Sequence, residues 1–221
     1  MKSREIALTG LMAALTLVVT RAFIIPIPQT KGFFNVGETA IYMAALLFGP
    51  RVGALAGGIG SALADLSLGY ASFAPFTLVI KGVEGYVVGL LGQRTQTGIV
   101  AMVPGALGLL AGVWALTFSS WLVRAAGITV LIAGAGALLL MSRRERARRT
   151  GARLAAMIAG GLLMVAGYFV TQAFILGLGV PAALVEVPYN IVQMTTGIVA
   201  GLVASAIFEQ AILTPQGQAA R

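Results

Sequence analysis

Long apolar segments alternate with short polar, charged or proline-containing turns along almost the whole chain. This pattern predicts an all-α integral membrane protein, because a helix of about 20 apolar residues crosses the hydrocarbon core of a bilayer. Eight crossings are predicted, at residues 5–21, 36–49, 52–68, 76–92, 99–118, 128–141, 154–176 and 188–209. The second segment would span only about 20 Å of a core near 30 Å thick, so we expect it to begin below the outer surface.

Charge and proline positions predict the turns and the orientation. Six of the fifteen cationic residues lie between two apolar segments, namely Arg143, Arg144, Arg146, Arg148, Arg149 and Arg153. Cytoplasmic loops carry such an excess of positive charge, so we place this turn and both termini on the cytoplasmic side of the cell membrane. The formal charge of +8 therefore does not indicate nucleic-acid binding. Outer loops are expected at 22–35, where two prolines enforce an extended chain, and at 177–187.

Composition supports the membrane class and excludes several kinds of chemistry. Of 221 residues, 58% are hydrophobic and 10% are charged, and the mean hydropathy is +0.95, more than a soluble core of this size could bury. The chain has no cysteine and no histidine, so we expect no disulfide, no metal site and no cofactor. No Gly-Lys dipeptide occurs, which excludes a nucleotide-binding P-loop, and the chain is not expected to be an enzyme.

Polar side chains inside the predicted crossings are candidates for a binding site, because an ionisable group in hydrocarbon costs at least a few kcal/mol. Counted at 1.5 Å per residue from the cytoplasmic ends, most of them lie about 20 to 28 Å up, in the outer third of the membrane. They are Asp65, Lys81, Tyr168, Gln172, Asn190 and Gln193, with Glu84 lower at about 15 Å. Their convergence predicts a small-molecule pocket that opens outward.

Several of these groups also have a purely structural interpretation. Lys81 and Glu84 are three apart on one helix and could neutralise each other. Asp65 could cap its helix or satisfy backbone groups in the outer turn. Tyr168 and Gln172 form an i, i+4 pair that could bridge helices instead of contacting a ligand.

For other positions one interpretation is preferred. For Asn190 and Gln193 we prefer contact with a ligand. An uncharged polar pair in lipid needs hydrogen-bond partners, and the neighbouring sequence offers none. Glu38 is expected to cap its helix or to pair with Arg21. Small residues recur at helical spacing within 53–64 and 82–92, and we interpret these glycines as sites of close helix packing.

Four ordered blocks carry a resemblance to a known family. They are GFFNVGETAIYMAALLFGPRVGALAGGIGSALADLSLGY, FAPFTLVIKGVEGYVVG, MVAGYFVTQAFILG and VEVPYNIVQMTTGIVAGLV. With these blocks the chain resembles the substrate-binding S component of energy-coupling factor (ECF) vitamin transporters, in the riboflavin-transporter-like group. The resemblance covers the first four and the last two predicted crossings.

The resemblance implies a function, partners and an architecture. A membrane subunit of this kind captures a water-soluble vitamin or vitamin precursor from outside. It associates with a transmembrane coupling subunit and two cytoplasmic ATPases, which supply the energy. The family core has six helices, here within residues 4–94 and 153–210, so the segment at about 98–142 looks like an inserted helical hairpin.

The resemblance also implies roles for individual residues. In the family the pocket is lined by the loop after the first helix and by helices four to six; the corresponding residues here are Asn35, Lys81, Glu84, Tyr168, Gln172, Asn190 and Gln193. The first helix of family members often carries Ala-x-x-x-Ala for docking to the coupling subunit. Gly10-x-x-x-Ala14 approximates that motif, with Ala7 on the same helix face.

The substrate class and two alternative functions stay open at this point. The mixed polar set suits a neutral or zwitterionic heteroaromatic, with a pyridoxine- or hydroxymethylpyrimidine-like molecule favoured over riboflavin, thiamine or pantothenate. An intramembrane enzyme would use Asp65, Lys81 and Glu84 as acid and base. A stand-alone secondary transporter would use Glu84 or Asp65 as a proton relay.

Overall fold

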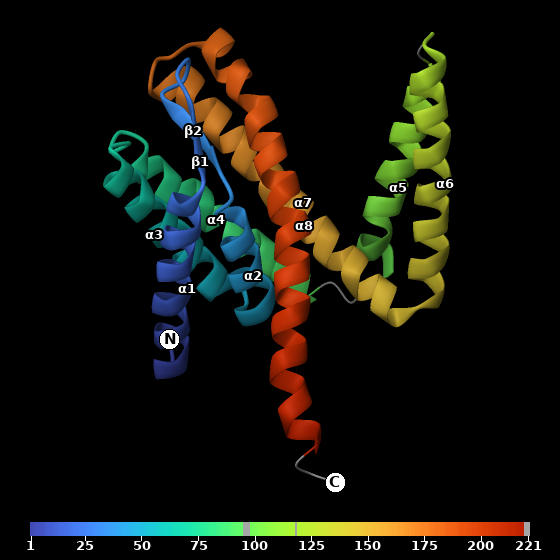
Figure 1. Cartoon of the computed structure of the whole chain (residues 1–221), viewed down its shortest axis with the longest axis horizontal. Coiled ribbons are helices and arrows are strands. Elements are labelled where there is room, and N and C mark those ends of the chain that lie inside the picture. The colour runs from blue at the N-terminus through green and yellow to red at the C-terminus, as the bar shows by residue number, and fades with distance from the viewer. Residues whose placement is uncertain (95–97, 118, 219–221) are drawn as a thin grey trace. The chain divides into compact units, whose positions relative to one another are not determined.

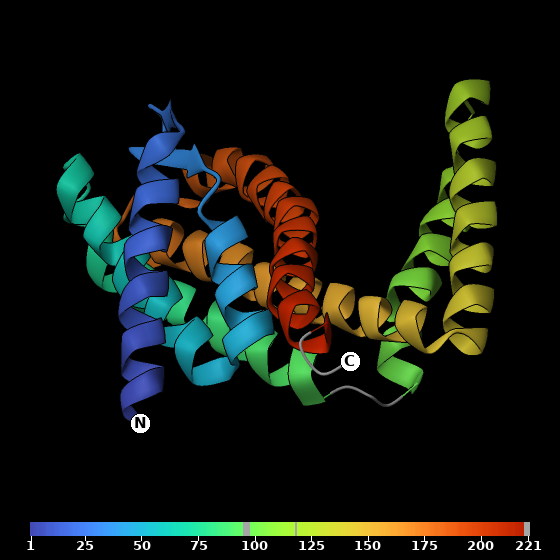
Figure 2. The same cartoon turned by 60° about the horizontal axis from the view of Figure 1, so that its bottom comes forward.

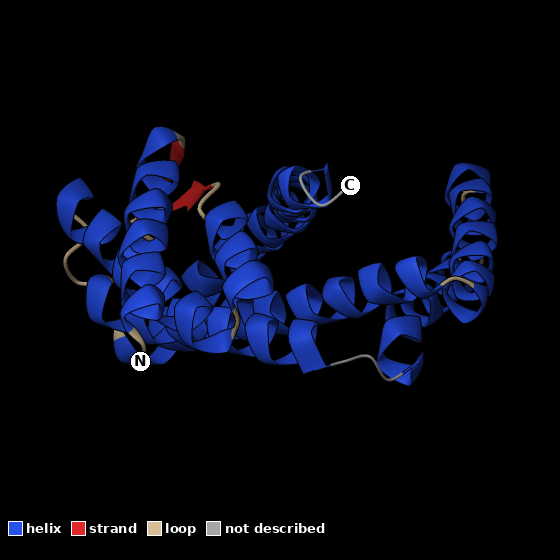
Figure 3. Cartoon of the chain, turned by 90° about the horizontal axis from the view of Figure 1, so that it is seen from below, coloured by secondary structure: helices blue, strands red, loops and turns tan. Residues whose placement is uncertain are grey.

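The computed structural model describes residues 1–94, 98–117 and 119–218, and in these residues the chain is helical apart from one two-stranded hairpin (Figures 1 and 3). The α-helices are α1 (Ser3–Ala22), α2 (Glu38–Phe48), α3 (Pro50–Leu68), α4 (Ala74–Arg94), α5 (Gly98–Ala115), α6 (Trp121–Arg143), α7 (Glu145–Val170) and α8 (Val180–Gln218). A π-helical turn, η1 (Thr171–Ile175), extends α7, and the strands are β1 (Ile24–Ile27) and β2 (Gly32–Asn35).

Five of the described helices contain segments long and apolar enough to cross a membrane. These segments are Ser3–Ala22, Ala74–Gln93, Trp121–Met141, Ala147–Ile175 and Val180–Ala211, and two shorter apolar helices are Glu38–Phe48 and Met102–Val113. The prediction of an all-α membrane protein is therefore confirmed, and a multi-pass arrangement follows from several such helices in one chain. The number of eight crossings stays a prediction.

The chain forms two compact units, one of Met1–Leu90 with Met157–Arg221 and one of Leu91–Ala156. In the first unit α2 lies between α1 and α8, and α3 packs against both α1 and α2 (Figure 2). A small apolar core joins these helices, formed by Met12, Ala13, Ala44, Val52 and Ala56. In the second unit α5 and α6 lie side by side, and the insertion of this pair into a six-helix core stays a prediction.

Glycines let α3 and α4 approach closely, as the small-residue spacing predicts. A Cβ atom at Gly53 would lie 2.7 Å from the carbonyl oxygen of Gly85, and one at Gly57 would lie 2.9 Å from that of Lys81. At the other end of α4, a Cβ at Gly89 would lie 2.6 Å from Pro50 Cα. Only a residue without a side chain fits at these points, so the packing role of the glycines is confirmed.

The loop after α1 forms an ordered antiparallel hairpin. Strand β1 pairs with β2 from Ile24 opposite Asn35 to Ile27 opposite Gly32. Pro26 is tolerated because this is a two-stranded edge, where its missing N–H need not pair. The predicted ordered, extended loop is confirmed, although its pairing into a hairpin was not anticipated by the sequence pattern.

Three helix starts differ from the prediction. Helix α6 begins at Trp121 rather than near 128, and α7 begins at Glu145, so most of the arginine run is helical. Helix α8 begins at Val180, so the predicted outer loop at 177–187 is wrong beyond its first three residues. Gly177 (φ 69°) and Gly179 (φ 84°) make the turn, while Pro181 lies in the first helical turn, where no backbone N–H is needed.

Candidate functional site

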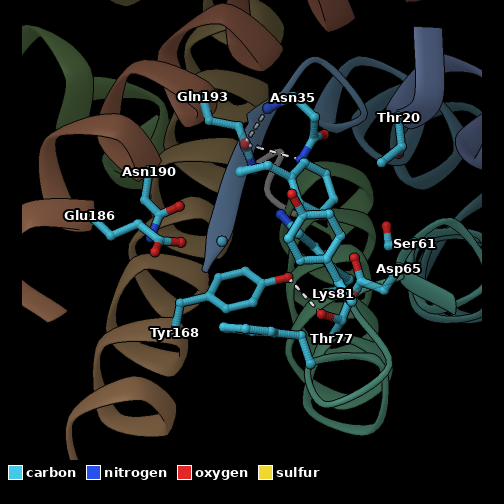
Figure 4. A pocket seen from close by; sticks show the side chains of 14 residues that line it. Thr20, Asn35, Ser61, Asp65, Thr77, Lys81, Tyr168, Glu186, Asn190 and Gln193 are labelled. Atoms are coloured by element: carbon cyan, nitrogen blue, oxygen red, sulfur yellow. Dashed lines mark hydrogen bonds between the residues drawn. The ribbon is translucent and has the colours of Figure 1, made fainter. Parts of the chain in front are cut away.

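A polar pocket lies beneath the hairpin within the first unit (Figure 4). Its walls come from α1, β2, α3, α4, α7, α8 and the turn before α4. The lining residues are Thr20, Gly32, Phe33, Asn35, Ser61, Asp65, Tyr70, Phe73, Thr77, Lys81, Tyr168, Glu186, Asn190 and Gln193. Segments separated by more than one hundred residues therefore contribute polar side chains to one site.

Six of the eight predicted ligand-contacting residues line this pocket, namely Asn35, Asp65, Lys81, Tyr168, Asn190 and Gln193. Glu84 and Gln172 are not among its lining residues, although both are fully buried. Gln172 lies in the π-helical turn, and neither polar atom of its side chain has a hydrogen-bond partner in the described part of the chain. Counting along the helices predicted a similar depth for these groups, but it could not predict the direction of each side chain.

An ion network adjoins the pocket through the lining residue Lys81. The Lys81 ammonium donates to Glu38 Oε1 and, at 3.1 Å, to Glu84 Oε2. Tyr42 Oη donates to the other oxygen of Glu84 at 2.8 Å. All four side chains are buried, which is tolerable in a low-dielectric interior only because each charge has an opposite partner. The expectation that Glu38 caps its helix or pairs with Arg21 is therefore wrong, because α4 brings Lys81 against it.

Gln193 connects this network to the hairpin. Its amide nitrogen donates to Glu38 Oε1 at 2.8 Å. Its amide oxygen accepts from the Asn35 backbone N–H at 2.9 Å and from Asn35 Nδ2 at 3.1 Å. Asn35 Oδ1 in turn accepts from the Gly37 N–H at 2.8 Å. The position of the hairpin end is thus coupled through α8 to the charges on α2 and α4.

Tyr168 forms the wall between α7 and α4. Its hydroxyl lies 3.1 Å from Thr77 Oγ1, and the Lys81 ammonium lies 5.5 Å from the centre of its ring. Such a distance is within the range of a cation–π contact. Tyr168 therefore bridges α7 and α4 through Thr77, which was one of the two interpretations offered for it. Its ring also faces the pocket (Figure 4).

Three polar side chains of the lining retain hydrogen-bonding capacity. The Asn190 side chain makes no hydrogen bond to the residues that the structure describes, and it is 5% exposed. Asp65 Oδ2 and Glu186 Oε2 are buried without a partner in that same part of the chain. Buried groups of this kind are normally satisfied, so they mark where a solute can bind.

Glu186 is the charged lining residue that the sequence reasoning missed. Its position fell within the outer loop predicted at 177–187. With α8 starting at Val180, positions 186, 190 and 193 are spaced i, i+4 and i+7 and share one helix face. This spacing could have identified Glu186 as a pocket residue from the sequence.

Aromatic side chains from the hairpin and from the turn before α4 line the pocket. The rings of Phe33 in β2 and Tyr70 in the turn before α4 are 4.6 Å apart between centroids. The remaining cavity measures about 30 Å³, which holds water but not a heterocycle. A ring-sized solute therefore requires these side chains or the hairpin to move.

Ala7, Gly10 and Ala14 lie on the exposed face of α1. A Cβ at Gly10 would meet no atom within 4 Å in the described structure. The opposite face of α1 packs into the first unit through Thr9, Met12, Ala13 and Thr16. The predicted docking residues are therefore exposed, and their docking role stays a prediction.

The chemistry available in the pocket is hydrogen bonding and charge complementarity. No group of three or more acidic side chains within the described residues is arranged to hold a metal ion. Lys81, Glu38 and Glu84 are engaged with one another. The arrangement suits reversible binding of a polar, ring-containing solute.

Comparison with known proteins gives a consistent result. Residues 1–123 match the family model of the ECF-type riboflavin transporter, S component. A protein of Pyrococcus woesei, named "Uncharacterized protein in gap 3'region", is 54% identical over 78 residues, which are 35% of this chain and 52% of that protein. The thiamine precursor transporter HmpT of Lactococcus lactis subsp. cremoris (strain MG1363) is 38% identical over 88 residues, 39% of this chain and 53% of that protein. The chain spans about half the length of the curated relatives it matches.

Proposed function

The chain belongs to the family of S components of ECF-type riboflavin transporters, and on this premise we propose that it captures a vitamin or vitamin precursor for ATP-driven import. Family membership makes it a membrane transport protein and not an enzyme. The observation that carries the proposal is the polar pocket, where α1, β2, α3, α4, α7 and α8 meet beneath the hairpin. Asn35, Asp65, Lys81, Tyr168, Asn190 and Gln193 would line the bound solute, with Glu84 holding Lys81 from below.

The energy for import would come from other subunits. A transmembrane coupling subunit and two cytoplasmic ATPases are the partners implied by the family, and the exposed face of Ala7, Gly10 and Ala14 would receive the coupling subunit. Helices within residues 4–94 and 153–210 would form the six-helix core, with the pair at 98–142 as an insertion. Both termini would lie in the cytoplasm, as the arginine run indicates.

The favoured substrate is a thiamine precursor of the hydroxymethylpyrimidine type. The relative from Lactococcus lactis is named as a thiamine precursor transporter. Phe33, Tyr70, Phe73 and Tyr168 supply aromatic surfaces on which a flat ring can stack. The neighbouring amide and carboxylate groups would fix its orientation.

Two measurements test this function. Mass spectrometry of the chain purified in detergent should identify a co-purified vitamin or precursor. Uptake in proteoliposomes should require ATP and the coupling subunits, with no accumulation by the chain alone. Accumulation by the chain alone under a proton gradient would instead establish secondary transport and overturn the proposal.

Asn190 provides a single-residue test of the site. Replacing Asn190 by Ala should weaken solute binding by at least about 1 kcal/mol, because the amide offers hydrogen bonds that alanine lacks. Calorimetric titration of the purified variant would measure the change. Thr195→Ala is the matched control, since Thr195 lies on an exposed part of α8 and bonds only its own helix backbone. Unchanged affinity of Asn190→Ala would remove this residue from the site.

A further inference from the structure

We propose that Asp65 and Glu186 form a two-carboxylate clamp, which selects a nitrogen heterocycle bearing an amino group and rejects anionic vitamins. This inference rests on the proposed function and specifies its substrate class. It assigns ligand recognition to Glu186, the acid on α8, together with Asp65 on α3 (Figure 4).

The two carboxylates are incompletely satisfied within the protein. Each residue is only 4% exposed. Asp65 Oδ2 and Glu186 Oε2 both lack a hydrogen-bond partner in the described residues. An acceptor left unpaired in a buried site costs about 1–3 kcal/mol, and more when it is charged. A solute with N–H donors would satisfy both oxygens.

The geometry directs both groups toward the same space. Asp65 and Glu186 enter from opposite sides of the pocket, with Tyr168 and Lys81 between them (Figure 4). A ring held between them can thus present donors at two edges while its face lies against an aromatic side chain. Charge-assisted hydrogen bonds at both edges would fix its orientation.

Gly32 of β2 makes room for the Glu186 carboxylate. A Cβ atom at this position would lie 2.7 Å from each carboxylate oxygen of Glu186. The strand therefore accommodates the acid without supplying a cation to neutralise it. A side chain at position 32 would displace the carboxylate from its place in the pocket.

The ammonium group that lines the pocket is not available to an anionic solute, because Lys81 already donates to Glu38 and Glu84. Among the described residues of this unit, the buried ionisable side chains are Lys81 against Glu38, Asp65, Glu84 and Glu186, a formal excess of three negative charges. A carboxylate- or phosphate-bearing solute would meet like charge in a low-dielectric site, where repulsion is strong.

The selectivity of the unmodified chain is the first test. The probes are 4-amino-5-hydroxymethyl-2-methylpyrimidine, the same pyrimidine with hydrogen in place of the amino group, and pantothenate as an anion. Calorimetry should show the aminopyrimidine binding at least about tenfold more tightly than the analogue without the amino group, and no binding of pantothenate. Equal affinity for the two pyrimidines, or tight binding of pantothenate, would overturn the clamp.

Isosteric variants supply the second test. Asp65→Asn and Glu186→Gln should each weaken binding of the aminopyrimidine at least about tenfold, because an amide nitrogen then faces the donor of the ligand. Glu145→Gln is the control, since Glu145 is exposed and pairs with Arg149 on α7. Gly32→Ala should reproduce the loss seen with Glu186→Gln without removing a charge.

The outcomes separate this inference from the function on which it rests. Unchanged affinity in both isosteric variants would refute the clamp, even if ATP-driven uptake of a vitamin is observed. Failure of uptake with a full set of subunits would refute the import function, even if the aminopyrimidine binds between the two carboxylates. If a variant does not fold, the selectivity of the unmodified chain for the three probes still tests the clamp.

Discussion

At the scale of single residues, the main feature is a lysine that forms ion pairs with two buried carboxylates from different helices. Lys81 contacts Glu38 on α2 and Glu84 on its own helix, and Tyr42 adds a hydrogen bond to Glu84. The sequence predicted the Lys81–Glu84 pair from its i, i+3 spacing. It could not predict Glu38 as a partner, because the rotation of α2 against α4 is decided by packing.

Replacing Lys81 by Met should destabilise the protein strongly. Two carboxylates would stay buried without their cation, which costs about 3–5 kcal/mol when one partner of a buried pair is removed. Thermal unfolding in detergent would measure the loss. Tyr42→Phe, which removes only the 2.8 Å bond to Glu84, should cost about 1–3 kcal/mol. A Lys81→Met variant as stable as the parent chain would contradict the network.

At the scale of helices, sequence reasoning succeeded where small residues or apolar length decide the structure. The bounds of α1 to α4 and the glycine contacts between α3 and α4 follow from spacing alone. It failed at the starts of α6, α7 and α8, which lie before the predicted apolar segments. A helix can continue through flanking polar residues, because arginine is a good helix former and proline is favoured in a first turn.

Two glycines on α4 should respond differently to the same substitution. A Cβ at Gly85 would overlap the Gly53 carbonyl group, so Gly85→Ala should separate α3 from α4 and cost about 1–3 kcal/mol. At Gly82 the nearest atom to an added Cβ is the Ala54 oxygen at 3.6 Å. Gly82→Ala should therefore be neutral or stabilise by up to about 1 kcal/mol. Melting temperatures in detergent would compare them, and equal effects would exclude the close contact.

At the scale of the whole molecule, the proposed function requires an internal pocket and an external face for the coupling subunit. The two are separate here, since the pocket lies beneath the hairpin while Gly10 faces outward from α1. Counting 1.5 Å per residue along the predicted helices brought five pocket residues together from four helices, because every helix has the same rise and is counted from the same side of the membrane. It missed Glu186, whose element was assigned to a loop.

A bulky residue at Gly10 should therefore uncouple transport from binding. Gly10→Leu meets open space within the chain, so folding and solute affinity should be unchanged. ATP-driven uptake should fall at least about tenfold, because close helix contact with a coupling subunit would be blocked. Gly136→Leu is the control, as Gly136 on α6 also has no atom within 4 Å of an added Cβ. Full uptake by Gly10→Leu would exclude this docking face.

The small size of the cavity, about 30 Å³ with Phe33 and Tyr70 in its lining, has a consequence for the kinetics of capture. Only the fraction of molecules in which these side chains or the hairpin have moved can admit a ring-sized solute. The observed dissociation constant is then the intrinsic one divided by that fraction. Entry would be paced by this movement and not by diffusion through water, and escape of the bound solute would need the same movement.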